Sequence, residues 1–289
     1  MAILSIQSHV AYGHVGNAAA AFPLQRLGFE VWRVNTVQFS NHTGYDDWQG
    51  QVFEPAHIAQ LIDGIAARGV LGECQAVLSG YLGDAALGAV ILDAVERVRR
   101  ANPAALYACD PVMGDREQGL FVRPGIPEFL RDRALPAADI ITPNQFELET
   151  LTGRAVRRLA DAVEAARLAL ALGPGVVLVT SLRHADTAPD EIEMLAVTAQ
   201  GAWRVATPFL ALDPAPNGAG DALAALFLAH YLKAGSQLNR TPEALERAAA
   251  AIYAVVEATG RAGTRELQII AAQDAFAQPA KSFAVEDVS

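Results

Sequence analysis

Ala2-Ile3-Leu4-Ser5-Ile6-Gln7 opens the chain, and this run decides the fold together with the segments that follow it. A short apolar run that ends at polar residues predicts a buried strand. A polar loop at residues 8–17 comes next, then an Ala-rich helix at Ala18–Leu27 and a second strand at Glu30–Asn35. This β–loop–α–β order is the unit from which parallel sheets are built.

The same alternation continues along the chain. Further strands are expected at Ala76–Ser79, Leu106–Cys109, Ile140–Thr142 and Val176–Thr180, and helices at Pro55–Arg68, Asp84–Arg100 and Leu159–Leu172. Glu193–Thr198 and Ala202–Thr207, joined through Gln200-Gly201, are typical of a hairpin and predict an antiparallel edge. The fold class is therefore α/β, a three-layer, doubly wound, mostly parallel sheet with helices on both faces.

Toward the C-terminus, Thr241-Pro242-Glu243 predicts a capped helix start, with the helix running to about residue 258. The segment Glu266–Ala277 is compatible with either a strand or a helix. No repeat, low-complexity tract or linker divides the chain, so we expect a single domain over residues 1–289.

Composition bounds the class of protein. Hydrophobic residues make up 52% of the chain and charged residues 19%, as in a globular protein. A formal net charge of −10 argues against a general nucleic-acid or anionic-membrane binder. Two cysteines without a CxxC motif fit a reducing compartment, and we expect no signal peptide and no transmembrane helix. The expected location is therefore the cytoplasm.

The segment Asn217-Gly218-Ala219-Gly220-Asp221 precedes an apolar Ala/Leu-rich run that predicts a helix. Free N–H groups and the positive dipole end at a helix start form an anion site. Asp221 places a carboxylate in the first turn, beside that site. A phosphate cradle with a proton acceptor next to it suggests phosphoryl transfer to an alcohol. The simpler alternative is a glycine turn before a helix whose Asp only complements the dipole.

Other polar residues are expected at the same edge of the sheet. Ligands of open α/β sheets bind beyond the carboxyl ends of the strands. The residues at those ends are Ser8, Ser79, Gly80, Tyr81, Asp110, Thr142, Pro143, Asn144 and Thr180. Two long Gly-containing loops, at residues 39–48 and 111–119, are candidate lids. Each of these features alone would be an ordinary turn or loop; their shared location indicates a site.

Several other chemistries lack their motifs. The sequence contains no G-x-x-x-x-G-K-[ST], no G-x-G-x-x-G after the first strand and no G-x-S-x-G around Ser79. The six histidines show neither H-x-x-x-H spacing nor cysteine partners, which argues against zinc. Among them, His42 is a candidate ligand contact.

Six sequence blocks occur along the chain, namely Gln7–Asn17, Val37–Trp48, Leu78–Gly83, Cys109–Gly114, Thr142–Glu147 and Gly218–Asp221. In this order they resemble the pyridoxal kinases of the ribokinase-like superfamily, and the resemblance covers essentially the whole chain. Gly218–Asp221 alone resembles small-molecule kinases in general. Val37–Trp48 is the most specific match and implies a kinase of B6 vitamers.

The resemblance implies a role for each matching residue. Ser8 would hydrogen-bond the pyridine ring, Thr43 and Gly44 would cover it, and Tyr81 would line its pocket. Asp221 would be the base for the 5′-hydroxymethyl group, in the conversion of pyridoxal to pyridoxal 5′-phosphate for vitamin B6 salvage. The transferring phosphoryl group would lie on the amides of Gly218, Ala219 and Gly220.

The resemblance also implies ATP, Mg²⁺ and a monovalent cation such as K⁺. The residues along the ATP phosphates and the metal would be Asp110, Thr142, Asn144, Glu147 and Thr180, with Asp110 and Glu147 at the metal. The nucleotide would run beside Thr207, Pro208, Phe209 and Leu210. Relatives are usually homodimers, so a homodimer is expected by likeness.

Two departures and two alternatives accompany this reading. Thr180 stands where bacterial relatives often carry Lys, and the Pro-rich stretch Ala211–Pro216 matches the family poorly. A hydroxymethylpyrimidine kinase would hold a similar flat heteroaromatic alcohol. A non-catalytic B6-vitamer binding protein is the alternative from another class, although binding alone needs no base. The residues do not rank pyridoxal, pyridoxine and pyridoxamine.

Overall fold

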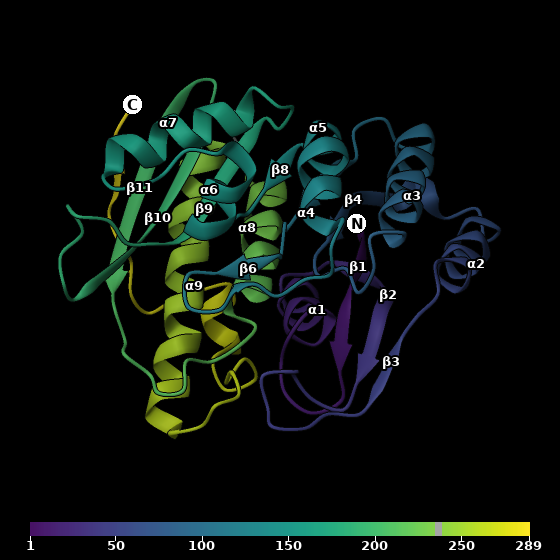
Figure 1. Ribbon diagram of the computed structural model, residues 1–289, viewed down its shortest axis with the longest axis horizontal. Helices are drawn as coiled ribbons and strands as arrows, with labels where there is room; N and C mark the ends of the chain where they lie inside the picture. The colour runs from purple at the N-terminus through teal and green to yellow at the C-terminus, as the bar shows by residue number, and fades with distance from the viewer. Residues whose placement is uncertain (235–238) are drawn as a thin grey trace.

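A computed structural model describes residues 1–234 and 239–289, and a ten-stranded sheet runs through its centre (Figure 1). The strand order is β12-β11-β10-β9-β8-β5-β4-β1-β2-β3. The strands that pair in parallel are β1 (Ala2–Val10), β2 (Glu30–Phe39), β4 (Cys74–Ser79), β5 (Leu106–Cys109), β8 (Ile140–Ile141) and β9 (Val176–Leu182). The fold class read from the sequence is confirmed.

The chain changes direction across the sheet at β1. From β1 it passes to β2 on one side, and it then returns to β4 on the other side of β1. The crossovers from these two strands leave on opposite sides, so a crevice opens above their carboxyl ends. This switch point is where a ligand site is expected.

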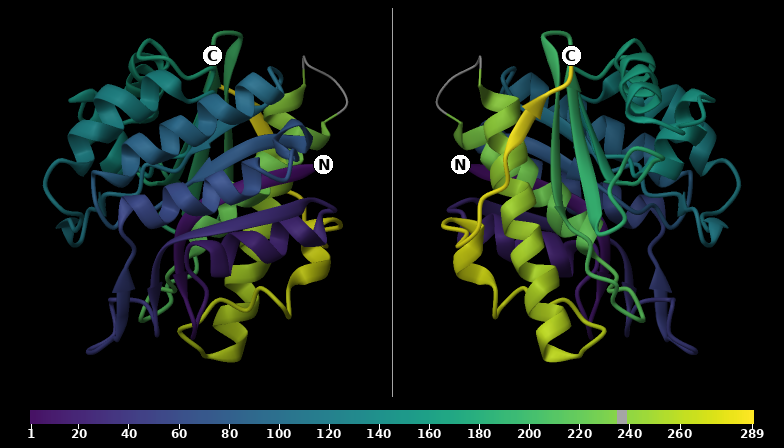
Figure 2. Two further views of the ribbon diagram at one scale, coloured as in Figure 1. Left: turned by 90° about the vertical axis from the view of Figure 1, so that its right-hand side faces the viewer. Right: turned by 90° about the vertical axis from the view of Figure 1, so that its left-hand side faces the viewer.

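Helices cover both faces of the sheet, and Figure 2 shows them on either side of the strands. One face carries α1 (Asn17–Arg26), α8 (Ala219–Lys233) and α9 (Arg240–Ala262). The other face carries α2 (Pro55–Ala66), α3 (Leu87–Ala101), α4 (Ile126–Phe129), α5 (Leu135–Ala137), α6 (Gln145–Thr152) and α7 (Leu159–Leu170).

Alternate residues of each parallel strand enter different cores. In β1, Ile3 packs with α1, α8 and α9, whereas Leu4 and Ile6 pack with α2 and α3 on the opposite face. Side chains of a strand point to alternate faces, and both faces are covered here, so the strand has to be apolar throughout. This is why Ala2–Gln7 reads as a continuous apolar run.

Antiparallel strands extend the sheet at both edges. The predicted hairpin is present as β10 (Glu191–Thr198) and β11 (Gly201–Pro208), and β12 (Val285–Asp287) pairs with β11. At the other edge, β3 (Gly50–Val52) pairs with the end of β2. Neither β3 nor β12 was expected, because three-residue strands leave almost no periodic signal.

Several predicted boundaries are wrong. The C-terminal helix begins at Arg240, so Thr241 lies inside its first turn rather than capping it, and the helix continues to Ala262. Pro242 is tolerated because first-turn N–H groups have no intrahelical acceptor. Segment 111–119 includes a small hairpin, β6 (Gly114–Asp115) with β7 (Gly119–Leu120), instead of a plain loop. Segment 266–277 is neither strand nor α-helix, since it forms turns and a 3₁₀ helix at Gln273–Phe276.

The segment between β7 and β9 contains the largest unpredicted part of the fold. It holds α4, a π-helical turn at Leu130–Ala134, α5 and α6. These pieces are short, and α4 and α5 contain prolines, so a 3.6-residue period does not develop in the sequence. In the part of the chain that the structure describes, no helix is long and apolar enough to cross a membrane.

Candidate active site

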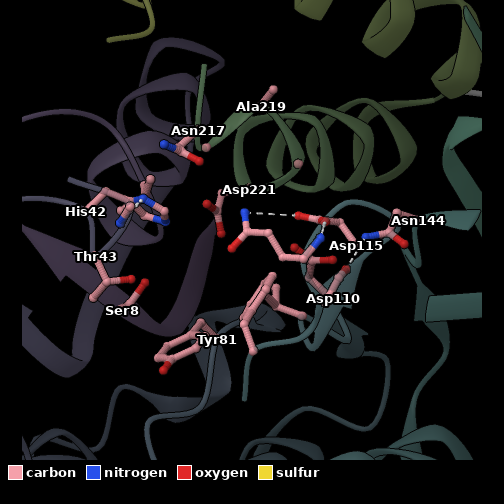
Figure 3. A pocket seen from close by; sticks show the side chains of 18 of the residues that line it. Ser8, His42, Thr43, Tyr81, Asp110, Asp115, Asn144, Asn217, Ala219 and Asp221 are labelled. Atoms are coloured by element: carbon pink, nitrogen blue, oxygen red, sulfur yellow. Dashed lines mark hydrogen bonds between the residues drawn. The ribbon is translucent and has the colours of Figure 1, made fainter. Parts of the chain in front are cut away.

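A cavity of about 400 Å³ lies at the carboxyl ends of the parallel strands (Figure 3). Each neighbouring segment contributes to its lining. Those residues include Ser8 and Val10 from β1, Tyr81 after β4, Asp110 after β5, Thr142 and Asn144 after β8, Thr180 from β9, and Gly218, Ala219, Gly220 and Asp221 at the start of α8. A cavity therefore lies at the edge of the sheet where the site is predicted.

The start of α8 has the geometry of an anion site. Gly218 is the residue before the helix, with φ of 87°, and no side chain caps the first turn. Ala222 N–H bonds back to Gly218 O at 3.0 Å, so the amides before it point out of the helix end. A Cβ on Gly218 would collide with the carbonyl oxygen of His14, whereas Gly220 has open space around it. Gly218 is therefore needed for the turn, and Gly220 leaves room for a ligand.

Asp221 is the third residue of α8, and its carboxylate faces the cavity. Burial raises the pKa of this carboxyl to about 6, and a hydrogen bond from the Gly16 N–H opposes that rise. A carboxylate with a pKa close to neutral accepts a proton more readily than one near the ordinary value. Asp221 therefore places a carboxyl of raised pKa beside the uncapped start of α8.

Two buried carboxyls, Asp110 and Glu147, also line the cavity, on the side of strands β5 and β8. Burial, together with the negative charges of Glu147 and Asp221, raises the pKa of Asp110 well above its usual range. Thr142 Oγ1 donates to Asp110 Oδ1 at 2.9 Å and favours the ionised form. Like charges crowded into one cavity are stabilised when a cation joins them.

Glu147 holds two turns of the site together. Its carboxylate accepts the N–H of Met113 at 2.9 Å and the N–H of Asn144 at 2.8 Å. Asn144 Oδ1 accepts the Glu147 N–H at 2.9 Å, which completes a capping box at the start of α6. Burial raises the pKa of Glu147, against the lowering effect of these amides. The Asn-x-x-Glu spacing is a sequence signal for this helix start that our sequence reading missed.

The opposite end of the cavity is apolar and carries the predicted ring-binding residues. Val10, Val15 and Phe39 pack together there, and Tyr81 packs against them. Thr43 and Gly44 line the same end, and Gly44 N–H donates to His42 Nδ1 at 3.0 Å. Burial and the nearby Arg265 guanidinium lower the pKa of His42, so its ring is neutral at pH 7. A flat, partly polar ring matches this end in shape and chemistry.

Some predicted residues lie elsewhere. Thr207–Leu210 do not line the cavity: Thr207 is buried in β11, and the Phe209 ring lies under the Arg183 guanidinium at 4.2 Å. Ser79 is buried and bonded to Tyr107 Oη at 2.9 Å. The lining also contains residues that the sequence did not single out as ligand contacts, namely Val112, Asp115, Gln118 and Phe121 around the β6–β7 hairpin, Ser181, Pro216 and Asn217.

Comparison with known proteins identifies the family. A model described as phosphomethylpyrimidine kinase matches residues 34–269. The chain is 60% identical over 288 residues to pyridoxal kinase PdxY of Rubrobacter xylanophilus, with 99% of this chain and 97% of the relative covered. It is 58% identical to pyridoxal kinase PdxY of Deinococcus radiodurans, covering 99% and 96%. The chain belongs to the pyridoxal kinase family.

Solved structures of pyridoxal kinases agree with this assignment. The enzyme from Leishmania donovani in complex with ADP and pyridoxamine superposes with a TM-score of 0.91 at 30% identity, over 100% of this chain and 99% of that one. The enzyme from Trypanosoma brucei superposes with a TM-score of 0.86, also at 30% identity, over 99% of both chains. Family membership gives the chain its activity, the phosphorylation of pyridoxal to pyridoxal 5′-phosphate in vitamin B6 salvage.

Proposed function

We propose that Asp221 is the base of this reaction and that the amides of Gly218, Ala219 and Gly220 hold the transferring phosphoryl group. The observation that carries the proposal is the position of Asp221 in the first turn of α8, where its carboxylate lines the cavity beside the uncapped helix start. The carboxylate orients the 5′-hydroxyl of pyridoxal and accepts its proton late in the transfer. Positioning and charge stabilisation supply most of the rate enhancement in phosphoryl transfer.

The vitamer occupies the apolar end of the cavity in this proposal. Its pyridine ring packs among Val10, Val15 and Phe39, with Tyr81 on the wall and Thr43-Gly44 above it. The Ser8 side chain faces the same space and donates or accepts at a ring substituent (Figure 3). The 5′-hydroxymethyl group then points along the cavity to Asp221.

ATP occupies the other end of the cavity in this proposal, which is supported by the complexes that the similar pyridoxal kinase from Leishmania donovani forms with ADP and a B6 vitamer. Its phosphates extend past Thr142, Asn144 and Thr180 to the start of α8. We propose that the nucleotide base continues beyond the cavity toward Thr207, Pro208, Phe209 and Leu210. The ring of Phe209, 37% exposed at the end of β11, offers a surface on which a base stacks.

The charges of the cavity fit a divalent cation. Among the described residues that line it, Asp110, Asp115, Glu147 and Asp221 are acidic, and none is Lys or Arg. Residues 1–234 and 239–289 contain no cluster of three or more side chains that would hold a metal by themselves. Mg²⁺ suits such a site, because it is usually bound by one or two carboxylates together with substrate phosphates and water.

In this site Asp110 and Glu147 would hold the metal. Glu147 already accepts two backbone N–H groups, so it would act on the metal through water, while Asp110 has an oxygen that would be available to it. A metal held there would neutralise the phosphate charge that a Lys at position 180 would otherwise share. K⁺ is the monovalent cation that the family resemblance implies.

We further propose a single domain over residues 1–289, a homodimer and a cytoplasmic location. One sheet joins the first strand to the last, and the helices of both faces pack on that sheet, which supports one domain. Cys74 and Cys109 are both buried and free, as in proteins of a reducing compartment.

ATP-to-ADP turnover with Mg²⁺ and K⁺ tests the proposal, with pyridoxal, pyridoxine, pyridoxamine and hydroxymethylpyrimidine compared in parallel. We expect saturable turnover with pyridoxal, loss of turnover on removing Mg²⁺, and little turnover with the pyrimidine. Pyridoxal turnover that survives Asp221→Asn unchanged contradicts the assigned base. Tight pyridoxal binding without any ATP turnover contradicts the kinase activity itself.

A further inference from the structure

One carboxylate outside the cavity contacts two of the loops that enclose it. Glu266 lies in the turn that follows α9, far along the chain from both loops. Tyr45 Oη in the lid segment donates to Glu266 Oε1 at 2.6 Å. His14 N–H in the loop after β1 donates to Glu266 Oε2 at 3.0 Å. The two oxygens of one side chain therefore bridge two segments of the site.

Arg265 adds a second contact with the same lid. Its Nη2 donates to Gly44 O at 2.6 Å, and its guanidinium lies 4.1 Å from the centre of the Tyr45 ring. Gly44 and Thr43 line the vitamer end of the cavity. Residues 265 and 266 thus hold the part of the lid that covers the substrate, although neither of them lines the cavity.

The turn that carries these two residues is firmly anchored. Gln268 N–H donates to Thr259 Oγ1 near the end of α9 at 3.0 Å, and Thr264 Oγ1 donates to Glu266 O at 3.1 Å. Leu267 and Ile269 are buried in the core that contains α8 and α9. The lid therefore contacts an anchored turn, and that turn packs in the same layer as α8, the helix that carries Asp221.

The other contact of Glu266 leads to the reacting groups. The carbonyl of His14 lies directly against Gly218, and the backbone amide of Gly16 is close enough to the Asp221 carboxyl to lower its pKa. Gly13, with φ of 93°, has no Cβ, and a Cβ there would collide with the Glu266 carboxylate. Loop 13–16 therefore connects Glu266 to the Gly218 turn before α8 and to the neighbourhood of the Asp221 carboxylate.

We propose that Glu266 is a positioning residue that couples closure of the lid over the vitamer ring to alignment of the His14–Gly16 loop with Asp221 and Gly218. The proposal rests on the proposed roles of Asp221 and of residues 43 and 44. With the lid closed, Tyr45 and His14 share the two oxygens of Glu266. When the lid opens, one oxygen loses its partner, and the loop beside the base loses part of its restraint.

The bond between Tyr45 and Glu266 keeps its donor protonated. The acceptor carboxylate raises the pKa of Tyr45 to about 12, with burial as a smaller cause. Tyr45 is consequently a neutral hydrogen-bond donor over the whole working range of pH. We call the two hydrogen bonds from Tyr45 and His14 to the oxygens of Glu266 the latch. Its formation requires no change in the protonation of Tyr45.

The two arms of the latch are separable by mutation. Tyr45→Phe removes only the lid arm, so we expect KM for pyridoxal to rise about tenfold, as for loss of a hydrogen bond to a charged group, while kcat falls less than in Glu266→Ala because the His14 bond remains. Glu266→Ala removes both arms, so it raises KM for pyridoxal similarly and also lowers kcat about tenfold or more. KM for ATP stays within about twofold in both variants.

A double-mutant cycle decides whether the two residues act together. Adding Tyr45→Phe to Glu266→Ala changes KM for pyridoxal no further if Glu266 is the partner through which Tyr45 acts. Glu266→Gln keeps one carbonyl oxygen and one donor, so it recovers part of the kcat that Glu266→Ala loses. Such rescue is not expected of a residue that merely fills space.

The chain offers a matched control in the same region. Tyr253 Oη donates to Glu257 Oε1 at 3.3 Å on α9, away from both loops. Tyr253→Phe and Glu257→Gln repeat the chemical changes without touching the lid, and we expect KM and kcat near wild type. Chymotryptic cleavage of the lid at Tyr45 and Trp48 gives a readout independent of turnover. Pyridoxal slows this cleavage in the wild type and the controls, but not in Glu266→Ala.

The outcomes separate this proposal from the proposed function. Wild-type kinetics in Glu266→Ala, or additive effects of Tyr45→Phe and Glu266→Ala, overturn the latch while Asp221→Asn still tests the base. Equal losses in the Glu257→Gln control overturn it as well, since they point to general loss of structure. Loss of turnover in Asp221→Asn together with non-additivity of the Tyr45–Glu266 pair supports both.

Discussion

Replacing Asp221 by Asn is expected to raise the free energy of unfolding of the protein and at the same time to lower its kcat. Burial raises the pKa of Asp221 from 3.8 to about 6, so the folded protein holds its proton more tightly than the unfolded chain does. The stability that this group contributes is therefore present at acidic pH and is lost as pH rises through about 6. Above that pH, the wild type carries the cost of a charged carboxylate in the cavity.

The size of the effect follows from the shift. Two pKa units correspond to at most about 3 kcal/mol at pH 8, and to about half that at pH 5, where much of the native carboxyl is still protonated. Asn carries no charge, and its carbonyl oxygen can still accept the Gly16 N–H. Asp221→Asn should accordingly raise the free energy of unfolding by up to about 3 kcal/mol at pH 8 and clearly less at pH 5. Its kcat should fall by about 10²–10⁴.

Urea denaturation at the two pH values, in buffers free of divalent metal, measures the stability difference. Asp274→Asn is the control, because the side chain of Asp274 is 91% exposed and has no burial cost to remove. Equal stabilisation of Asp221→Asn at both pH values, or destabilisation at pH 8, would refute the reasoning that the carboxylate is held at an electrostatic cost. Mg²⁺ with ATP should narrow the difference between wild type and variant.

Three further predictions concern the cavity. The kcat/KM of the wild type should rise with pH through about 6, as Asp221 loses its proton, and a profile that is flat from pH 5 to pH 8 would contradict this. Thr180→Lys places a cation among the carboxylates and should move that acid limb to lower pH by about one unit, measured in the same assay. The side chain of Gly220→Val has room at the helix start, so this variant should keep the wild-type melting temperature while its kcat falls about 10²–10³. A Gly220→Val variant changed only in KM would indicate a packing role instead. Gly218→Ala, by contrast, should lower the free energy of unfolding by about 1–3 kcal/mol.

The tertiary structure shows where reading from the sequence was sound. The strand at residues 2–7, the hairpin at β10–β11 and the helix start before Asp221 each carry their signal within a dozen residues. The periodicity of apolar residues and the glycines at the turn are local properties, so their consequences were predictable. The short helices α4, α5 and α6 between β7 and β9 carry no such period and were missed, whereas β8 and α7 in the same stretch were predicted.

The sequence by itself determined the order of the layers, the edge of the sheet at which the cavity lies and the place of Asp221 at a helix start. These follow from alternation, from strand direction and from a local glycine turn. Only the tertiary structure decided the raised pKa values of Asp110 and Asp221, because burial and like charges arise when distant segments meet. It alone brought Glu266 to Tyr45 and His14, since contacts between residues so far apart in the chain exist only after the core of α8 and α9 has packed.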